Sequence, residues 1–129
     1  MCSSDLHARK KELVTRGFDA SGLAQTFRLY DSHLQKMEDA LAGRPWLAGE
    51  TFSLADIAMT PYVNRLDMLG MSEMWTAKRP RVTDWFARIK SRPTFKPAFL
   101  DWCPKDLTND LRTFGQQSWP SVQRILAAA

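Results

Sequence analysis

Histidine and cysteine, which often act in acid–base and covalent chemistry, are rare in this 129-residue chain. The chain has two histidines, His7 and His33, and the apolar repeat around His33 places that side chain on the polar face of a helix. Its two cysteines, Cys2 and Cys103, have neither metal-ligand nor redox spacing. No zinc-binding or phosphate-binding motif is present. The sequence therefore predicts neither a self-contained catalytic site nor a metal site.

Asp56 is a carboxylate whose neighbours in the sequence define a structural role. Ser53 can cap a helix that begins one residue later by accepting from the N–H of Asp56, and the Asp56 carboxylate can accept from the N–H of Ser53 in return. Phe52 and Ile57 have the spacing of a hydrophobic staple across the same helix start. A carboxylate in the first turn is also stabilised by the helix dipole. We interpret these four residues as a structural cap.

The helix that follows this cap is predicted to lie at the centre of a helical bundle. Nearly every position over residues 54–63 is apolar, and a helix that is apolar on all sides is buried. Pro61 lies within it and cannot donate to the carbonyl of Ile57, so we expect the helix to bend there. The helix should end near Gly70.

The rest of the chain has helical periodicity and lacks the alternation that is typical of strands. A long helix is predicted over residues 23–41, with Asp19 or Ser21 as its cap, and another over 81–91. Shorter helices are predicted over 7–16, 95–100, 106–114 and 120–128. The expected fold is therefore all-α, a bundle of five to seven helices. The expected core consists of Leu23, Phe27, Tyr30, Leu34, Leu54, Ile57, Leu66, Trp85, Phe86 and Ile89.

Composition favours one globular domain that does not enter membranes. Hydrophobic residues make up 44% of the chain and charged residues 25%, and no apolar run approaches the roughly 20 residues that a membrane span needs. The net charge is +4, but the basic residues are dispersed and interrupted by acids, which favours a solvated surface over a nucleic-acid site. The two cysteines favour a reducing, cytoplasmic location.

Three motifs occur in a fixed order along the middle of the chain. Pro-Trp-Leu-Ala-Gly at 45–49 is followed by Phe-Ser-Leu-Ala-Asp-Ile at 52–57, then by Trp85 and by Arg-Pro at 92–93. This arrangement resembles the C-terminal helical domain of the glutathione S-transferase superfamily. The resemblance covers roughly residues 20–100 and leaves 101–129 outside it.

The resemblance implies that the chain is the helical half of an enzyme that transfers the thiol of glutathione to a hydrophobic electrophile. In the family, an N-terminal thioredoxin-like domain binds most of the glutathione and supplies the residue that activates its thiol. No strand–helix–strand pattern occurs here, so no catalytic residue is carried over and the chain alone is expected to be inactive. The parent protein is expected to be a homodimer without a metal.

The resemblance also implies where the electrophile would bind. In the family, the helical domain forms one wall of that pocket from its first helix, its central helix and its C-terminal segment. The matching positions in this sequence are Lys11, Val14, Tyr62, Arg65, Phe99 and Trp102. Arg65 follows the apolar run of the central helix, so its charge is expected to need a partner or a cleft.

A non-catalytic function is the alternative to an enzyme. Similar helical domains occur as protein-assembly modules in translation factors and aminoacyl-tRNA synthetases, and a basic pI near 9.3 suits that role. The dispersed charge and the lack of a lysine-rich linker favour the enzyme. The sequence upstream would separate the two readings.

The first six residues have the features of a sequencing artefact. Cys-Ser-Ser-Asp-Leu at 2–6 is encoded by TGC-TCT-TCC-GAT-CTN, which matches the end of a common sequencing adapter, although coincidence is the alternative. We expect the helical domain itself to comprise residues 7–129. On this hypothesis Cys2 has no biological role.

Deletion of residues 1–6 should therefore leave the fold intact. Met1 and Leu6 are the only large apolar residues in the segment, and chain ends are loosely held. The free energy of unfolding, measured by urea titration, should change by no more than about 0.5 kcal/mol. A loss above about 1 kcal/mol would show a packed, native segment, because surface changes do not reach that size.

Overall fold

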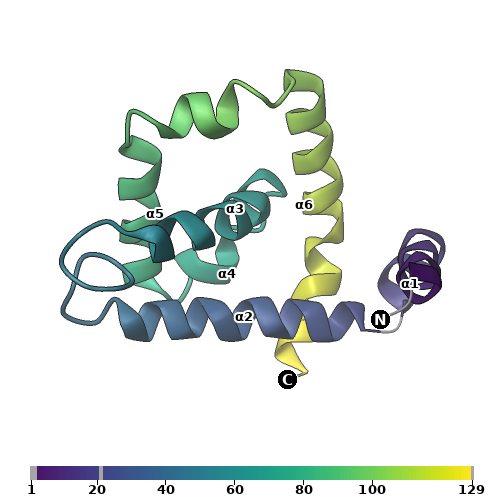
Figure 1. Ribbon diagram of the computed structural model, residues 1–129. Helices are drawn as coiled ribbons and strands as arrows, with labels where there is room; N and C mark the ends of the chain where they lie inside the picture. The colour runs from purple at the N-terminus through teal and green to yellow at the C-terminus, as the bar shows by residue number, and fades with distance from the viewer. Residues whose placement is uncertain (1–2, 21, 129) are drawn as a thin grey trace.

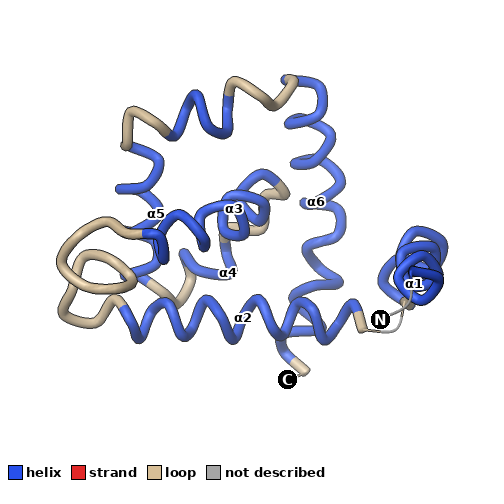
Figure 2. The backbone as a smooth tube through the Cα atoms, viewed as in Figure 1, coloured by secondary structure: helices blue, strands red, loops and turns tan. Residues whose placement is uncertain are grey.

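The computed structural model describes residues 3–20 and 22–128, and these are helical without a strand (Figure 2). The α-helices are α1 (Ser3–Arg16), α2 (Leu23–Ala40), α3 (Leu54–Met68), α4 (Glu73–Thr76), α5 (Pro80–Ser91) and α6 (Lys105–Ala127). A 3-10 turn, η1 (Gly17–Asp19), and a π-helical turn, η2 (Lys96–Leu100), complete the set. The predicted all-α bundle of five to seven helices is confirmed.

Helix α3 lies in the middle of the arrangement, with α2, α5, η2 and α6 around it (Figure 1). Helix α1 extends away beyond the start of α2 and has no buried residue. The remaining α-helices and the segments between them contribute to one buried cluster. It consists of Leu34, Met37, Leu41, Val63, Leu66, Met71, Met74, Trp75, Val82, Trp85, Phe86, Ile89, Phe95 and Val122.

The predicted core is wrong at two positions. Leu54 is 80% exposed and Ile57 is 51% exposed. The apolar pattern of α3 indicated burial on all sides, but no described element covers the outer face of its first turn. Five predicted residues are buried: Leu34, Leu66, Trp85, Phe86 and Ile89. Leu23, Phe27 and Tyr30 are partly buried.

The start of one predicted helix and the predicted cap of another also differ from the structure. The helix expected over 7–16 begins at Ser3, and the preceding residues 1 and 2 lie outside the described part. Helix α2 begins after Gly22, which has a φ of 84° and makes no side-chain cap, whereas Asp19 lies in η1. The other proposed cap, Ser21, is not among the described residues.

The two C-terminal helices predicted over 106–114 and 120–128 form the single helix α6. Pro120 lies within it, where it removes one backbone hydrogen bond at a cost of about 3 kcal/mol. Gly115 and Val122 are buried on either side of Pro120. Packing on both sides of Pro120 keeps the helix continuous. The sequence around the proline indicates a helix end and contains no information about this packing.

Gly115 sets how closely α6 approaches the end of α3. A Cβ atom at this position would lie 1.9 Å from the carbonyl oxygen of Leu69. That oxygen belongs to the backbone and cannot move aside as a flexible side chain could. The contact between α3 and α6 therefore requires glycine at this position.

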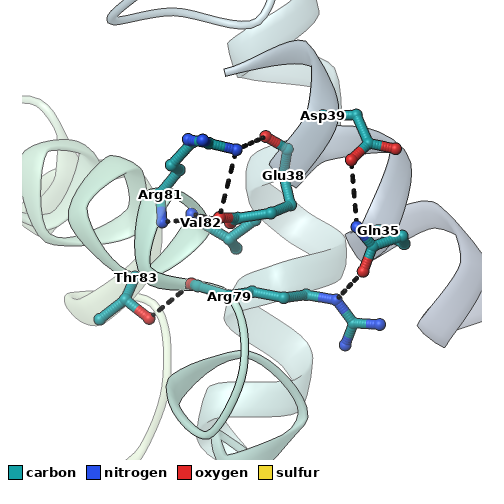
Figure 3. A network of polar contacts seen from close by, with 7 residues as sticks. All are labelled: Gln35, Glu38, Asp39, Arg79, Arg81, Val82 and Thr83. Atoms are coloured by element: carbon teal, nitrogen blue, oxygen red, sulfur yellow. Dashed lines mark hydrogen bonds and ion pairs between the residues drawn. The ribbon is translucent and has the colours of Figure 1, made fainter. Parts of the chain in front are cut away.

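Buried polar contacts join α2 to α4 and α5. Arg79 is 2% exposed, lies 2.9 Å from the Asp31 carboxylate and donates to Gln35 at 3.3 Å. Burial raises the pKa of Asp31, but Arg79 and then Lys78 outweigh it and hold that pKa below its usual value. Figure 3 shows Arg79 crossing toward α2.

Glu38 of α2 supplies the N-terminal cap that α5 does not provide for itself. Its carboxylate accepts from the backbone N–H of Arg81 at 3.2 Å and of Val82 at 2.9 Å (Figure 3). No side chain next to the start of α5 makes a capping bond. A buried carboxylate on one helix thus fixes the first turn of another.

The cap of α3 extends beyond its own helix. Asp56 is fully buried and accepts from the N–H of Ser53 at 2.9 Å, while the Ser53 hydroxyl accepts from the N–H of Ala55 at 3.2 Å. Asp56 also accepts from the N–H of Leu47 at 3.1 Å and from the indole N–H of Trp85 at 2.8 Å. One carboxylate therefore connects the preceding loop, the start of α3 and α5.

Substitutions at this cap should be less than additive. Ser53→Ala should cost about 0.5–2 kcal/mol of unfolding free energy. Asp56→Ala should cost about 3 kcal/mol or more, because each buried donor that it leaves without an acceptor costs about 1–3 kcal/mol. In a double-mutant cycle by urea unfolding, the pair should cost less than the sum.

Asp106→Ala is the matched control, because Asp106 is an exposed acid in the first turn of α6. It should change the unfolding free energy by about 0.5 kcal/mol or less. Strict additivity of the Ser53 and Asp56 substitutions would show that the two residues do not act as one unit.

Gly115→Ala should destabilise the protein although alanine is the better helix former. The overpacked contact with Leu69 should cost about 1–3 kcal/mol, and more if α6 must shift. Gln117→Ala, at an exposed position of the same helix, should change the unfolding free energy by less than about 0.5 kcal/mol. Equal stabilities of the two variants would contradict the close approach.

Candidate functional site

An apolar hollow of about 350 Å³ lies between α2 and α3. The rings of Tyr30 and Tyr62 are tilted by 59° relative to each other there, with their centroids 6.4 Å apart. Burial raises the pKa of Tyr30, Tyr62 raises it further, and Arg65 opposes the shift. A tyrosine hydroxyl can both donate and accept a hydrogen bond. The lining residues are Thr26, Leu29, Tyr30, His33, Met59 and Tyr62.

A second hollow, of about 230 Å³, lies between α3 and the segment that contains η2. It brings together three residues predicted to line a ligand pocket: Arg65, Phe99 and Trp102. Trp102 is 82% exposed, and its indole N–H donates to the Pro97 carbonyl at 2.7 Å, which fixes the ring beside η2. The other lining residues are Pro61, Asn64, Met68, Ala98 and Cys103.

The charge of Arg65 was predicted to need a partner or a cleft. The residue is exposed and borders the second hollow. It lies one turn after Tyr62, so α3 presents a phenol to one hollow and a guanidinium to the other.

A third hollow, of about 220 Å³, lies at the start of α3, next to α5 and η2. Phe52 and Ile57, the two residues of the predicted staple, both border it. The Arg92 guanidinium lies 3.6 Å from the centroid of the Phe52 ring. Phe99 borders this hollow as well as the second one, so the two are neighbours along α3.

Lys11 and Val14 are not brought to these hollows. Both lie on α1, where Val14 is 86% exposed and no residue is buried. Helical spacing within α1 placed the two side chains relative to each other, but nothing local fixes where α1 lies relative to α3.

Sequence reasoning missed two residues with reactive side chains at this face. His33 is exposed, as expected, but also borders the hollow that Tyr30 and Tyr62 line. Its position three residues after Tyr30, one helical turn along, was the signal. Cys103 is a free cysteine that accepts a hydrogen bond from the Thr108 hydroxyl at 3.3 Å. Its place next to Trp102 was the signal there.

The described residues include no group of three or more histidines, cysteines and acids that could hold a metal ion. Over the same residues, no helix combines the length and apolar character that crossing a membrane requires.

Comparison with known proteins identifies the family. The family described as "Glutathione S-transferase, C-terminal domain" matches residues 20–88. The chain is 33% identical over 92 residues to the tetrachloro-p-hydroquinone reductive dehalogenase of Sphingobium chlorophenolicum, which is 71% of this chain and 37% of the relative. It is 35% identical over 101 residues to FtsZ-localized protein A of Caulobacter vibrioides, covering 77% of this chain and 43% of that one.

A third relative is the disulfide-bond oxidoreductase YfcG of Escherichia coli, 38% identical over 82 residues, 59% of this chain and 32% of the relative. No solved structure matches. The chain thus spans less than half the length of these three relatives. The family match covers more than half of the chain, and the protein therefore belongs to the glutathione S-transferase superfamily, of which residues 20–88 represent the C-terminal domain.

Proposed function

We propose that the α3 face is the electrophile-binding wall of a glutathione S-transferase-like enzyme. The observation that carries this proposal is that Arg65, Phe99 and Trp102 border one hollow while Tyr62 borders the next, in a chain that matches the family. Glutathione would be held mainly by a thioredoxin-like domain of the parent protein.

In the proposed reaction, the glutathione thiolate attacks an electrophilic carbon held at the α3 face. A sulfur–carbon bond forms as the leaving group departs with its electron pair. The α3 face contributes by holding the electrophile in reach, which removes much of the entropic part of the barrier. One relative is named for reductive dehalogenation of tetrachloro-p-hydroquinone, and a flat aromatic ring of that kind fits a wall built from tyrosine, phenylalanine and tryptophan.

A non-catalytic assembly module is the second candidate. Leu54 and Ile57 leave apolar surface exposed at the start of α3, and such patches mark contacts between proteins. One relative is named for its localisation with FtsZ, which suits a role in assembly. The enzyme reading accounts for the aromatic hollows as well, so we favour it.

The test joins this chain to the N-terminal part of the E. coli relative YfcG and measures conjugation of glutathione to a chlorodinitrobenzene. The chain alone should be inactive and the fusion active. In the fusion, Trp102→Ala should raise the KM for the electrophile about tenfold, which corresponds to about 1.4 kcal/mol of lost binding. Phe114→Ala, an exposed aromatic on α6, is the matched control and should leave KM unchanged.

Conjugation by residues 7–129 alone would contradict the view that the helical domain needs a second domain. An active fusion with equal KM for both variants would remove Trp102 from the site. Tight RNA binding by the chain that weakens steeply with salt would favour the assembly module, because phosphate contacts have that salt dependence.

A further inference from the structure

A fourth hollow, of about 160 Å³, lies outside the α3 face, where the end of α2 and the following loop meet α5. It differs from the other three in its charge. Three of its six lining residues are arginines, whereas the hollows beside α3 are lined mainly by apolar and aromatic side chains. The lining consists of Leu41, Arg44, Pro45, Arg81, Asp84 and Arg88.

Two of these arginines donate to neutral acceptors and form no ion pair among the described residues. Arg44 donates through Nε to the carbonyl of Ala40, and Arg88 donates through Nη2 to the carbonyl of Pro45. Arg88 also stacks on Trp46, 5.2 Å from the ring centroid. Backbone carbonyls fix the two guanidinium groups without cancelling their charges. In addition, Arg88 Nε is buried and has no hydrogen-bond partner among the described residues.

The third arginine is only weakly neutralised. The nearest carboxylate oxygen of Glu38 is 3.8 Å from Arg81 Nη1. That carboxylate is already occupied by the backbone N–H groups of Arg81 and Val82 (Figure 3). Asp84 is the one acid in the lining. The lining therefore contains three guanidinium groups and one carboxylate, that of Asp84. Even with the nearby Glu38 carboxylate included, positive charge is in excess.

We propose that this hollow binds a multiply charged oxyanion, a phosphate group or a dicarboxylate. The planar guanidinium fork pairs with phosphate and carboxylate oxygens through two parallel N–H donors. The hollow is several times larger than the roughly 30 Å³ that one water occupies in the liquid, so a tetrahedral oxyanion fits. Such a ligand would accept from donors that the protein leaves unused and would connect α5 to the segment after α2.

The site is independent of the proposed enzyme activity. Arg44, Arg81 and Arg88 do not border any of the three hollows beside α3. A negative result for electrophile binding at the α3 face would therefore not decide whether this hollow binds an anion, and the reverse also holds.

The experiment titrates the full chain with sodium phosphate, and separately with sodium succinate, at constant ionic strength. Binding is measured by isothermal titration calorimetry and by the rise in Tm, since a ligand that binds only the folded state raises Tm. Arg44→Gln and Arg81→Gln should each weaken binding about tenfold or more, as expected for one lost charge-assisted hydrogen bond. Arg124→Gln is the matched control on α6, where Arg124 donates to the Ser121 hydroxyl. This variant should bind both anions with the affinity of the wild-type protein.

Saturable binding of phosphate, lost in the two site variants, supports a phosphate ligand. Saturable binding of succinate with the same losses supports a dicarboxylate ligand. Absence of saturable binding of both anions, or equal weakening by Arg124→Gln, overturns the site. If a site variant does not fold, NMR of the arginine N–H groups in the unchanged protein replaces it. Shifts confined to the three lining arginines then support the proposal, and shifts spread over all arginines overturn it.

Discussion

The buried carboxylate of Asp56 is the group on which the arrangement of the helices around α3 most depends. A fully buried charge is tolerated only where several donors surround it, and Asp56 receives N–H groups from three separate segments: Leu47 in the loop, Ser53 at the cap and Trp85 on α5. Satisfying this one charge fixes the loop, the start of α3 and the depth of α5 together. Because Phe52 lies directly before the cap, the same constraint sets the wall of the hollow at the start of α3.

Signals that are local in the sequence were sufficient for most of the helices, and contacts between distant residues were beyond them. Apolar repeats placed α2, α3 and α5, and a cap motif fixed the start of α3, because these signals lie within each helix. The cap of α5 comes instead from Glu38 on α2. The continuity of α6 through Pro120 depends on packing against other helices, and Arg79 reaches Asp31, 48 residues earlier in the chain. Nothing in the residues around either position encodes the partner.

The candidate site also contains residues that local spacing could place and residues that it could not. Tyr62 and Arg65 lie one helical turn apart, so their placement on neighbouring parts of α3 followed from spacing. The approach of Phe99 and Trp102 to Arg65 depends on how the chain turns after α5, and family resemblance supplied what periodicity could not. Lys11 and Val14 show the limit of that transfer: their helix was predicted, but no residue of α1 is buried, so the apolar pattern of the sequence does not place this helix relative to α3.

Helix α3 combines a buried face with an exposed apolar one, and this division connects fold with function. Val63 and Leu66 are almost completely buried in the core, whereas Leu54, Ile57 and Tyr62 are at least half exposed. Covering exposed apolar surface with a ligand or another protein surface is favourable by about 25 cal/mol per Å² of buried area. The inner face holds α3 in place whether or not the outer face is covered, because the Asp56 contacts and the core lie on the inner side. The proposed electrophile-binding wall would require this division, because a wall that binds and releases its ligand must keep its fold when it is uncovered.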